Sequence, residues 1–288
     1  MSIQISHLNY IYNEGTPMEI HALEDIDLTI NDGDFIGLIG HTGCGKSTFT
    51  QQLNGLLRAT SGDILYNGQS IYAEGFSMKE LRSKVGLVFQ YPEHQLFEVD
   101  VITDVMFGPK NLGLSEEEAR ERAKEALAMV GMGENFYEKS PFDLSGGEKR
   151  RAAIAGVLAM KPEVLILDEP TAGLDPRGRD EILGEVAKLH RENGLTIVLV
   201  SHSMEDVAAY VNRLIVMNQG KVLYDAAPKE VFRHGDRLEE IGLAAPQVTY
   251  ITNELKKNGI DAGEDITTVE EAKDAILAWW RGRKEAGL

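Results

Sequence analysis

The segment LIGHTGCGKST at residues 38–48 constrains the fold of this chain more than any other part of the sequence. It meets the pattern G-x-x-x-x-G-K-[ST], whose backbone N–H groups surround a phosphate while a helix N-terminus adds positive potential. The pattern requires a strand before the loop and a helix after it. Residues 35–40 are apolar, as in a short buried strand, and residues 46–57 are typical of a helix. The segment therefore predicts an α/β core that binds a nucleotide.

The chemistry of phosphate binding explains the types of residue in this loop. Glycine lets the backbone approach the phosphates closely and adopt positive φ angles. Lys46 is expected to reach the β- and γ-phosphates as a catalytic residue, and the Ser47 hydroxyl is expected to be a ligand for Mg²⁺. The predicted nucleotide-binding residues of the loop are Gly40, His41, Thr42, Gly43, Cys44, Gly45, Lys46, Ser47 and Thr48.

A second candidate site follows the apolar run at residues 164–167. Asp168 and Glu169 come directly after it, at the C-terminal end of a predicted strand, where open α/β sheets bind their ligands. An aspartate there suits Mg²⁺ coordination, and a glutamate suits polarisation of an attacking water. Taken alone, the segment is better interpreted as a solvated strand end before a proline. Together with the phosphate-binding loop, it predicts a metal-assisted site.

Composition and charge narrow the classes of function. The 288 residues carry a formal net charge of −17, which argues against broad contact with nucleic acid because such contact needs basic surface. Cys44 is the one cysteine, so an internal disulfide is excluded and a reducing compartment is favoured. The sequence shows no long apolar run and no leader peptide, so the chain is expected to be soluble and unprocessed.

The order of patterns along the chain predicts a helical subdomain inserted into a mostly parallel, helix-flanked sheet. Residues 1–35 alternate apolar and polar side chains, as in an N-terminal antiparallel β-subdomain. From about residue 91 to residue 160 the pattern is helical, and Ser115 and Glu118 have the spacing of a capping box. Residues 62–71 and 84–90 are predicted to form strands with glycine-containing turns, and the further predicted strands are residues 164–170, 196–202 and 213–224.

The segment LSGGEKRR at residues 144–151 narrows the class further. Ser145 and the amides after it predict a second anion-binding helix N-terminus. In this setting the segment resembles the signature motif of ABC-transporter ATPases, and the resemblance extends in motif order over residues 1–235. It implies a P-loop NTPase fold, ATP hydrolysis with ATP and Mg²⁺ as cofactors, and an ATP-binding domain at residues 1–240.

The resemblance gives several isolated polar and aromatic residues a role. Tyr12 matches the aromatic residue that stacks on adenine, although Tyr10 lies two residues away and strand aromatics commonly serve packing. Gln90 matches the Q-loop glutamine that contacts Mg²⁺ and senses the membrane partner. His202 matches the switch histidine, whose imidazole can hydrogen-bond the γ-phosphate or the attacking water.

The signature is implied to act on the ATP of a second subunit. Ser145, Gly146 and Gly147 match its ATP-contacting part, and Asp175 matches the D-loop aspartate. Glu148 departs from the glutamine usual in the signature, and we expect function to survive because the serine and glycines remain. Two domains stacked head to tail would enclose ATP between the phosphate-binding loop of one and the signature of the other. A lone monomer should therefore hydrolyse ATP poorly.

The implied mechanism combines positioning with charge stabilisation. Asp168 matches the Walker B aspartate, and with Ser47 and Gln90 it completes the predicted set of Mg²⁺ ligands. Glu169 matches the catalytic glutamate that aligns water, and His202 is implied to hold the γ-phosphate end.

Residues 91–113, YPEHQLFEVDVITDVMFGPKNLG, are similar to a segment of the ATPases of energy-coupling factor (ECF) importers of vitamins and transition-metal ions, cobalt importers included. Residues 144–176 are similar to the same group, and residues 12–30 and 40–48 to the second of its two ATPase subunit types. This implies a transmembrane coupling protein, a membrane-embedded substrate-binding subunit and a second ATPase subunit, either another copy or a related chain. The chain would lie peripherally on the cytoplasmic face of the cell membrane, and residues 91–113 would help form a groove for a coupling helix of the membrane partner.

Three other classes are weighed against this interpretation. A conventional ABC transporter subunit is the nearest. An ABC ATPase acting on DNA or ribosomes is disfavoured by the negative charge and by the 54 residues between Gln90 and Ser145, too few for a long coiled-coil arm. A non-catalytic regulator is disfavoured because Lys46, Glu169 and His202 are all present.

Residues 241–288 lie beyond the ATP-binding domain and resemble the C-terminal helical extension that joins the two ECF ATPase subunits. Their apolar positions are spaced as on a helix, with Val248, Ile251 and Leu255 on one face. Thr267 and Glu270 have capping-box spacing, and Trp279 and Trp280 suggest a contact surface. The alternative is that these helices fold back on their own core.

Overall fold

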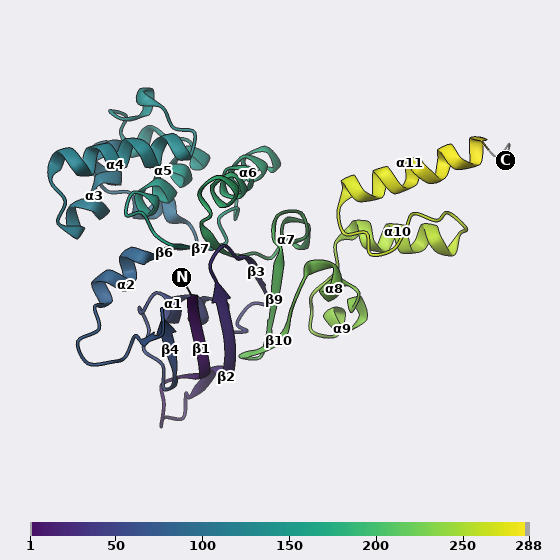
Figure 1. Ribbon diagram of the computed structural model, residues 1–288, viewed down its shortest axis with the longest axis horizontal. Coiled ribbons are helices and arrows are strands. Elements are labelled where there is room, and N and C mark those ends of the chain that lie inside the picture. The colour runs from purple at the N-terminus through teal and green to yellow at the C-terminus, as the bar shows by residue number, and fades with distance from the viewer. Residues whose placement is uncertain (1, 286–288) are drawn as a thin grey trace.

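The structure, a computed structural model, describes residues 2–285 and the side chains of residues 2–283. Its central element is a six-stranded sheet with the strand order β10-β9-β3-β8-β7-β6 (Figure 1). All neighbouring pairs are parallel except β9 and β10, so the predicted mostly parallel α/β core is confirmed. The strands are β3 (Phe35–Ile39), β6 (Val85–Val88), β7 (Val164–Asp168), β8 (Thr196–Val200), β9 (Arg213–Asn218) and β10 (Lys221–Ala226).

Both faces of this sheet are buried. Successive side chains of a strand point to opposite faces, so the two faces contribute to two apolar clusters. In β7, Ile166 belongs to one apolar cluster and Leu167 to the other. Helix α1 (Lys46–Leu53), which follows the phosphate-binding loop, shares the first cluster with the antiparallel sheet. Helix α5 (Gly146–Leu158), which begins at the signature, belongs to the second. The two motifs therefore start helices on opposite faces of the sheet.

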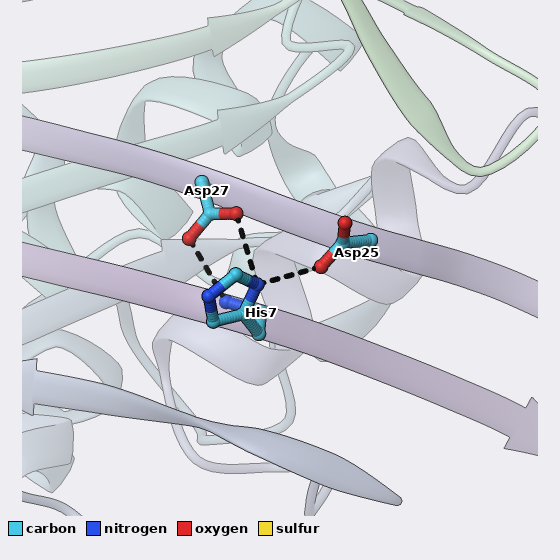
Figure 2. A group of neighbouring side chains, drawn as sticks. All are labelled: His7, Asp25 and Asp27. Atoms are coloured by element: carbon cyan, nitrogen blue, oxygen red, sulfur yellow. Dashed lines mark hydrogen bonds and ion pairs between the residues drawn. The ribbon is translucent and has the colours of Figure 1, made fainter.

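The N-terminal subdomain is a four-stranded antiparallel sheet, as predicted, with the order β2-β1-β4-β5. The ladder between its first two strands is bulged, and His7 and Asp25 both have positive φ angles at the bulge. Figure 2 shows the His7 imidazole facing the carboxylates of Asp25 and Asp27, at 2.8 and 3.3 Å from Nδ1. The Asp25 hydrogen bond, with the charge of Asp27, raises the pKa of His7. The strands are β1 (Ser2–Tyr12), β2 (Ile20–Asn31), β4 (Ser61–Tyr66) and β5 (Gln69–Ser70).

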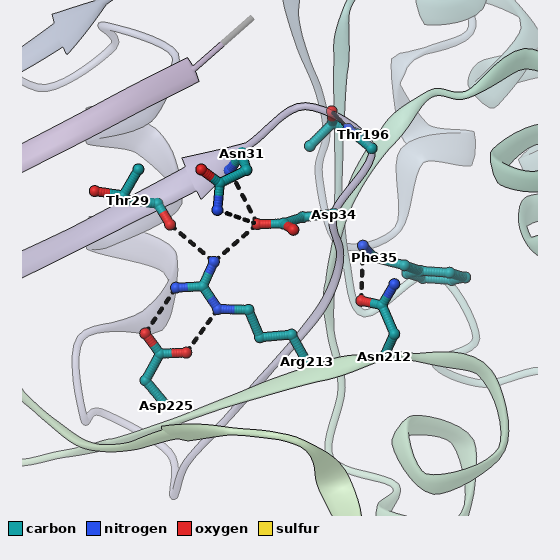
Figure 3. A network of polar contacts seen from close by, with 9 residues as sticks. Thr29, Asn31, Asp34, Phe35, Thr196, Asn212, Arg213 and Asp225 are labelled. Atoms are coloured by element: carbon teal, nitrogen blue, oxygen red, sulfur yellow. Dashed lines mark hydrogen bonds and ion pairs between the residues drawn. The ribbon is translucent and has the colours of Figure 1, made fainter.

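Arg213 joins the antiparallel sheet to the central sheet. Its guanidinium group donates to the Thr29 carbonyl oxygen and to Asp34, both at 2.8 Å, and forms a bidentate pair with Asp225 at 2.7 Å (Figure 3). These carboxylates and its hydrogen bonds raise the pKa of Arg213. Because a planar guanidinium group can hold two carboxylates and a carbonyl at once, this residue links the edges of the two sheets.

The predicted helical subdomain is present after β6, and the Ser115–Glu118 capping box forms at the start of α4. Helices α3, α4 and α5 contact one another and share one apolar cluster with the central sheet. The elements from β5 to α5 are α2 (Met78–Lys84), η1 (Pro92–Gln95), α3 (Val101–Leu112), α4 (Glu116–Met129), η2 (Glu134–Phe136), η3 (Pro141–Asp143) and α5.

Glu185 lies on α6 (Pro176–Asn193), where burial raises its pKa to about 7. An ordinary glutamate has a pKa near 4.3, so the folded chain keeps this proton to a higher pH than the unfolded chain does. The free energy of unfolding therefore falls as pH rises from about 4.5 to about 7. We expect Glu185→Gln to be about 1–2 kcal/mol more stable than the parent at pH 8, after allowance for solvent screening, and equal to it below about pH 4.5. Urea unfolding at both pH values tests this, and a pH-independent difference would contradict it.

The C-terminal region ends in helices α10 and α11, which project away from the central sheet (Figure 1), whereas the helices that precede them, α7, α8 and α9, contribute buried side chains to the apolar cluster on that sheet. The helices after β8 are α7 (Met204–Tyr210), α8 (Pro228–Phe232), α9 (Gly235–Glu240), α10 (Gln247–Lys257) and α11 (Val269–Glu285). Among residues 2–285, no helix has both the length and the apolar character needed to span a bilayer. The predicted extension runs to residue 288, and residues 286–288 lie outside the described part.

Three local predictions need correction. The cap of α11 uses Thr268 and Glu271, one residue later than predicted: the Glu271 amide donates to the Thr268 hydroxyl, and the Glu271 carboxylate accepts from the Thr268 amide. The predicted strand 213–224 is a hairpin, because Gln219 and Gly220 both adopt positive φ. The helix predicted at residues 46–57 ends at Leu53.

Candidate functional site

The phosphate-binding loop runs from the end of β3 to the start of α1. Gly40, Gly43 and Gly45 have φ angles of 156°, 82° and 106°. A Cβ atom at Gly40 would lie 2.4 Å from both the Cys44 sulfur and the Met217 carbonyl oxygen. Glycine is therefore required at Gly40 by space as well as by backbone conformation.

Lys46 lies inside this loop and is only 6% exposed. Its ammonium group donates to the carbonyl oxygens of Gly40 at 2.7 Å and His41 at 3.1 Å. Cys44 is buried beside it, and burial raises the pKa of the thiol. The loop thus holds a cation at its centre, while the cysteine acts as a small apolar side chain.

Asp168 ends β7 and is buried, which raises its pKa, while a hydrogen bond from Ser47 acts in the opposite direction. The two residues come from different elements, yet a hydroxyl and a carboxylate oxygen meet beside Lys46. Oxygen ligands of this kind suit Mg²⁺, which the Ser47 and Asp168 side chains could hold together with waters and phosphate oxygens.

Glu169 is held from both sides. The Gln90 amide donates to one carboxylate oxygen of Glu169 at 2.7 Å, and His202 Nε2 lies 2.7 Å from the other. The three residues follow β6, β7 and β8, which are neighbours in the central sheet. Glu169 has a φ of 51°, a strained conformation for a non-glycine residue that is typical of functional sites. The sheet thus brings together three residues that are far apart in the sequence.

Tyr12 lies beside the phosphate-binding loop, where its hydroxyl is 3.1 Å from the Thr48 hydroxyl. Tyr10 meets it edge to face, with 4.7 Å between ring centroids, and packs against the buried cluster under the antiparallel sheet. Tyr12 is the more exposed of the two and is the one joined to the loop, which favours it as the residue that contacts a base.

The signature residues are arranged at the start of α5. The Ser145 hydroxyl accepts from the Glu148 amide at 3.3 Å, and the Glu148 carboxylate accepts from the Ser145 amide at 2.7 Å. This second hydrogen bond lowers the pKa of Glu148. A Cβ atom added at Gly146 or Gly147 would meet open space, so this helix end is accessible. Because α5 and α1 pack on opposite faces of the sheet, the signature is not placed to serve Lys46 of its own chain.

Asp175 caps α6, where its carboxylate accepts from the Gly178 amide at 2.7 Å. On the same helix, Arg179 donates to the buried Asp206 at 2.7 Å. Asp206 is the third residue of α7, the helix that follows His202, and its amide donates to the Ser203 hydroxyl. The D-loop and switch segments are therefore tied together behind Glu169.

Two residues that sequence reasoning missed lie on the other side of the site. Arg150 is 2% exposed and pairs with Glu93 at 2.9 Å. The sequence did hold a signal for Arg150, since it precedes Ile154 and Leu158 by four and eight residues, on the buried face of α5.

A groove of about 660 Å³ separates the helical subdomain from the core. Phe97 and Phe107 line it with their rings edge to face at 5.0 Å, and both are exposed. Leu56 and Arg82, which come from the core, also line it. The groove therefore offers apolar surface from both subdomains.

Comparison with known proteins agrees with this geometry. The sequence model of the ABC transporter family matches residues 23–172. The energy-coupling factor transporter ATP-binding protein EcfA2 of Caldanaerobacter subterraneus is 54% identical over 284 residues and covers 99% of each chain. The protein of the same name from Clostridium perfringens is 56% identical and covers 96% of this chain and 98% of its own.

Solved structures give the same result. The structure of cbiO1 from Clostridium perfringens, described as part of the ABC transporter complex cbiONQ, has a TM-score of 0.74 at 40% identity and covers 88% of this chain and 98% of its own. A dimeric, post-hydrolysis structure of the ATP-binding cassette MJ0796 with ADP and Pi has a TM-score of 0.70 at 29% identity. The match covers 78% of this chain and 98% of the MJ0796 chain. The chain therefore belongs to the ABC transporter family and, within it, to the energy-coupling factor transporter ATP-binding proteins.

Proposed function

We propose that this chain hydrolyses ATP to power an energy-coupling factor importer, with Glu169 orienting the attacking water. The observation that carries the proposal is the position of the Glu169 carboxylate, held between Gln90 and His202 at 2.7 Å on each side. Mg²⁺, which Ser47, Asp168 and the side-chain oxygen of Gln90 would hold, would supply charge neutralisation on the phosphates. Lys46 would contribute the second fixed positive charge there.

The complete site requires a second subunit. In each chain the signature helix α5 and the loop helix α1 lie on opposite sides of the sheet. ATP on one chain would therefore be completed by Ser145, Gly146 and Gly147 of another, through the open N-terminus of α5, which suits an anion. The second subunit is another copy or a related chain.

The apolar groove beside Phe97 and Phe107 is proposed to receive a cytoplasmic helix of a transmembrane coupling protein. It is lined by both subdomains, so a helix bound there would respond when they rotate relative to each other. We accordingly propose that the protein lies peripherally on the cytoplasmic face of the cell membrane, beside a membrane-embedded subunit that selects a vitamin or transition-metal ion.

The ATP-binding domain is proposed to span residues 1–240, and the extension from residue 241 onward is proposed to join the two ATPase subunits. Ile251 on α10 and Trp280 on α11 are more than half exposed. Trp279 is covered by the guanidinium group of Arg283, 5.1 Å from its ring centroid. Exposed apolar side chains on both helices support a contact surface.

Membrane association of the full chain tests the groove assignment. Phe97→Glu places a charge among apolar groove residues, so we expect it to release most of the protein from native membranes while ATP binding is retained. Val99→Glu is the matched control, because Val99 lies two residues away, is 78% exposed and does not line the groove. Equal membrane binding of the two variants would refute the assignment of the groove. That result would favour another docking site or a non-transport role.

Glu148→Gln tests the effect of the acid in the signature. Glu148 places a negative charge at the helix end proposed to meet the γ-phosphate of a second subunit. Removing a like charge about 4 Å from a phosphate is worth about 1 kcal/mol in water, so we expect the ATP concentration for half-maximal hydrolysis to fall about fivefold. The neutral amide keeps the hydrogen bond to the Ser145 amide, so stability should change little. A rise in that concentration would contradict this account.

A further inference from the structure

Arg150 connects three parts of the site that are separate in sequence. One edge of its guanidinium group, Nε and Nη2, donates to the two carboxylate oxygens of Glu93 at distances of 2.9 to 3.3 Å. Its Nη1 donates to the carbonyl oxygens of Pro170 and Ala172, both at 2.8 Å. A single buried cation on the signature helix therefore contacts the segment after Gln90 and the segment after Glu169.

Each of the two contacted segments directly follows a residue whose backbone conformation is strained. Tyr91 has a φ of 56° and Glu169 a φ of 51°, and neither is glycine. Such conformations cost roughly 1–3 kcal/mol each and persist only where surrounding contacts enforce them. Glu93 lies two residues after Tyr91, and Pro170 directly follows Glu169. The bonds to Arg150 therefore fix each chain segment just beyond its strained residue.

Gln90 and Glu169 lie just before these two segments. Their side chains meet at 2.7 Å, where the Gln90 amide donates to the Glu169 carboxylate. The hydrogen bonds of Arg150 go to neither of these side chains. Arg150 holds the backbone carbonyl of Pro170, which is next to Glu169. Through Glu93 it also holds the short helix η1, which follows Gln90.

We propose that Arg150 is a positioning residue for ATP hydrolysis: with Glu93 it sets the Gln90–Glu169 hydrogen bond and so couples the signature helix to the residue that orients water. A guanidinium group is required because it presents donors along a planar fork to a carboxylate and to two carbonyls at once. A lysine at this position supplies the charge without that geometry. The proposal rests on the proposed role of Glu169.

The test is steady-state ATP hydrolysis by the full chain in its assembled complex, with melting temperature measured in parallel. A misplacement of about 1 Å can cost about a hundredfold in rate, so we expect Arg150→Lys to lower kcat by about that factor. The KM for ATP should stay within about threefold, because Lys46 and the loop are untouched. Arg237→Lys is the matched control, since Arg237 forms an exposed ion pair with Glu240 on α9. It should leave kcat unchanged.

Glu93→Gln keeps the bonds from Arg150 to the Pro170 and Ala172 carbonyls, so it tests the coupling even if Arg150→Lys does not fold. We expect a lower kcat at an unchanged melting temperature. The double variant should be no slower than Arg150→Lys alone, because the two residues act as one unit. Parental kcat in a folded Glu93→Gln protein, or a higher KM at unchanged kcat, would overturn the proposal.

Glu169→Gln, measured in the same assay, distinguishes the proposed role of Glu169 from the positioning role of Arg150. If Glu169→Gln hydrolyses ATP at the parental rate, the role of Glu169 fails and the positioning role fails with it. If Glu169→Gln is inactive while Arg150→Lys and Glu93→Gln are both fully active, only the positioning role is refuted.

Discussion

Glu169→Gln is expected to bind ATP as the parent does and to hydrolyse it about 10²–10⁴-fold more slowly, the range for loss of a general base. Glutamine has the shape of glutamate and can keep contacts to Gln90 and His202, which lie 2.7 Å from the two carboxylate oxygens. What it loses is the negative charge that orients and polarises water. Single-turnover hydrolysis together with equilibrium ATP binding measures the two properties separately.

The matched control is Glu163→Gln, at the opposite end of β7. Glu163 forms an ion pair with Lys84 at 2.9 Å and accepts a hydrogen bond from Tyr66 at 2.7 Å. Its replacement should lower stability but leave the hydrolysis rate unchanged, because it lies at the end of the strand away from the phosphate-binding loop. Comparable loss of hydrolysis in both variants would show that the effect is structural and would remove Glu169 from its proposed role.

Lys46→Ala is expected to weaken ATP binding about tenfold to a hundredfold and to abolish measurable turnover. The basis is the loss of charge-assisted hydrogen bonds to phosphate, each worth about 1.5–3 kcal/mol. Lys46 is 6% exposed and donates to two carbonyl oxygens of its own loop, so the cation is held where phosphates would bind. Calorimetric titration with a slowly hydrolysed ATP analogue measures the affinity directly.

Lys124→Ala provides the control, since Lys124 pairs with Glu121 on the exposed side of α4, in the helical subdomain. It should bind ATP like the parent. If Lys46→Ala keeps parental affinity while its melting temperature is unchanged, the loop is not the site of phosphate binding. A drop in melting temperature without a change in affinity would assign Lys46 a structural role only.

The site residues were predicted from sequence on two grounds: some belong to a short motif with fixed spacing, whereas Tyr12, Gln90 and His202 were assigned through the resemblance to ABC-transporter ATPases. The loop from Gly40 to Ser47 and the pair Asp168 and Glu169 could be identified because their chemistry is encoded locally. The parallel sheet then follows from apolar strands alternating with helices. Motif spacing was therefore sufficient to predict the fold class, and the roles of these residues in ATP hydrolysis stay predictions.

The contacts that hold the site together could not be predicted in the same way. The pair Arg150–Glu93 and the pair Arg179–Asp206 join residues that are 57 and 27 positions apart. No local pattern fixes such partners, because they depend on how the helical subdomain and α7 pack against the sheet. Boundaries failed for a related reason: Gln219 and Gly220 turn the chain at a place where the apolar pattern alone suggested a continuous strand.

The central claim is that this chain powers a membrane importer as one of two ATPase subunits. The most direct measurement is identification by mass spectrometry of the proteins that remain bound to tagged Glu169→Gln protein, extracted from native membranes in mild detergent with ATP and Mg²⁺. The account predicts a transmembrane coupling protein, a small hydrophobic substrate-binding subunit and a second ATPase subunit. Recovery of ribosomal or DNA-associated proteins without a membrane partner would contradict it.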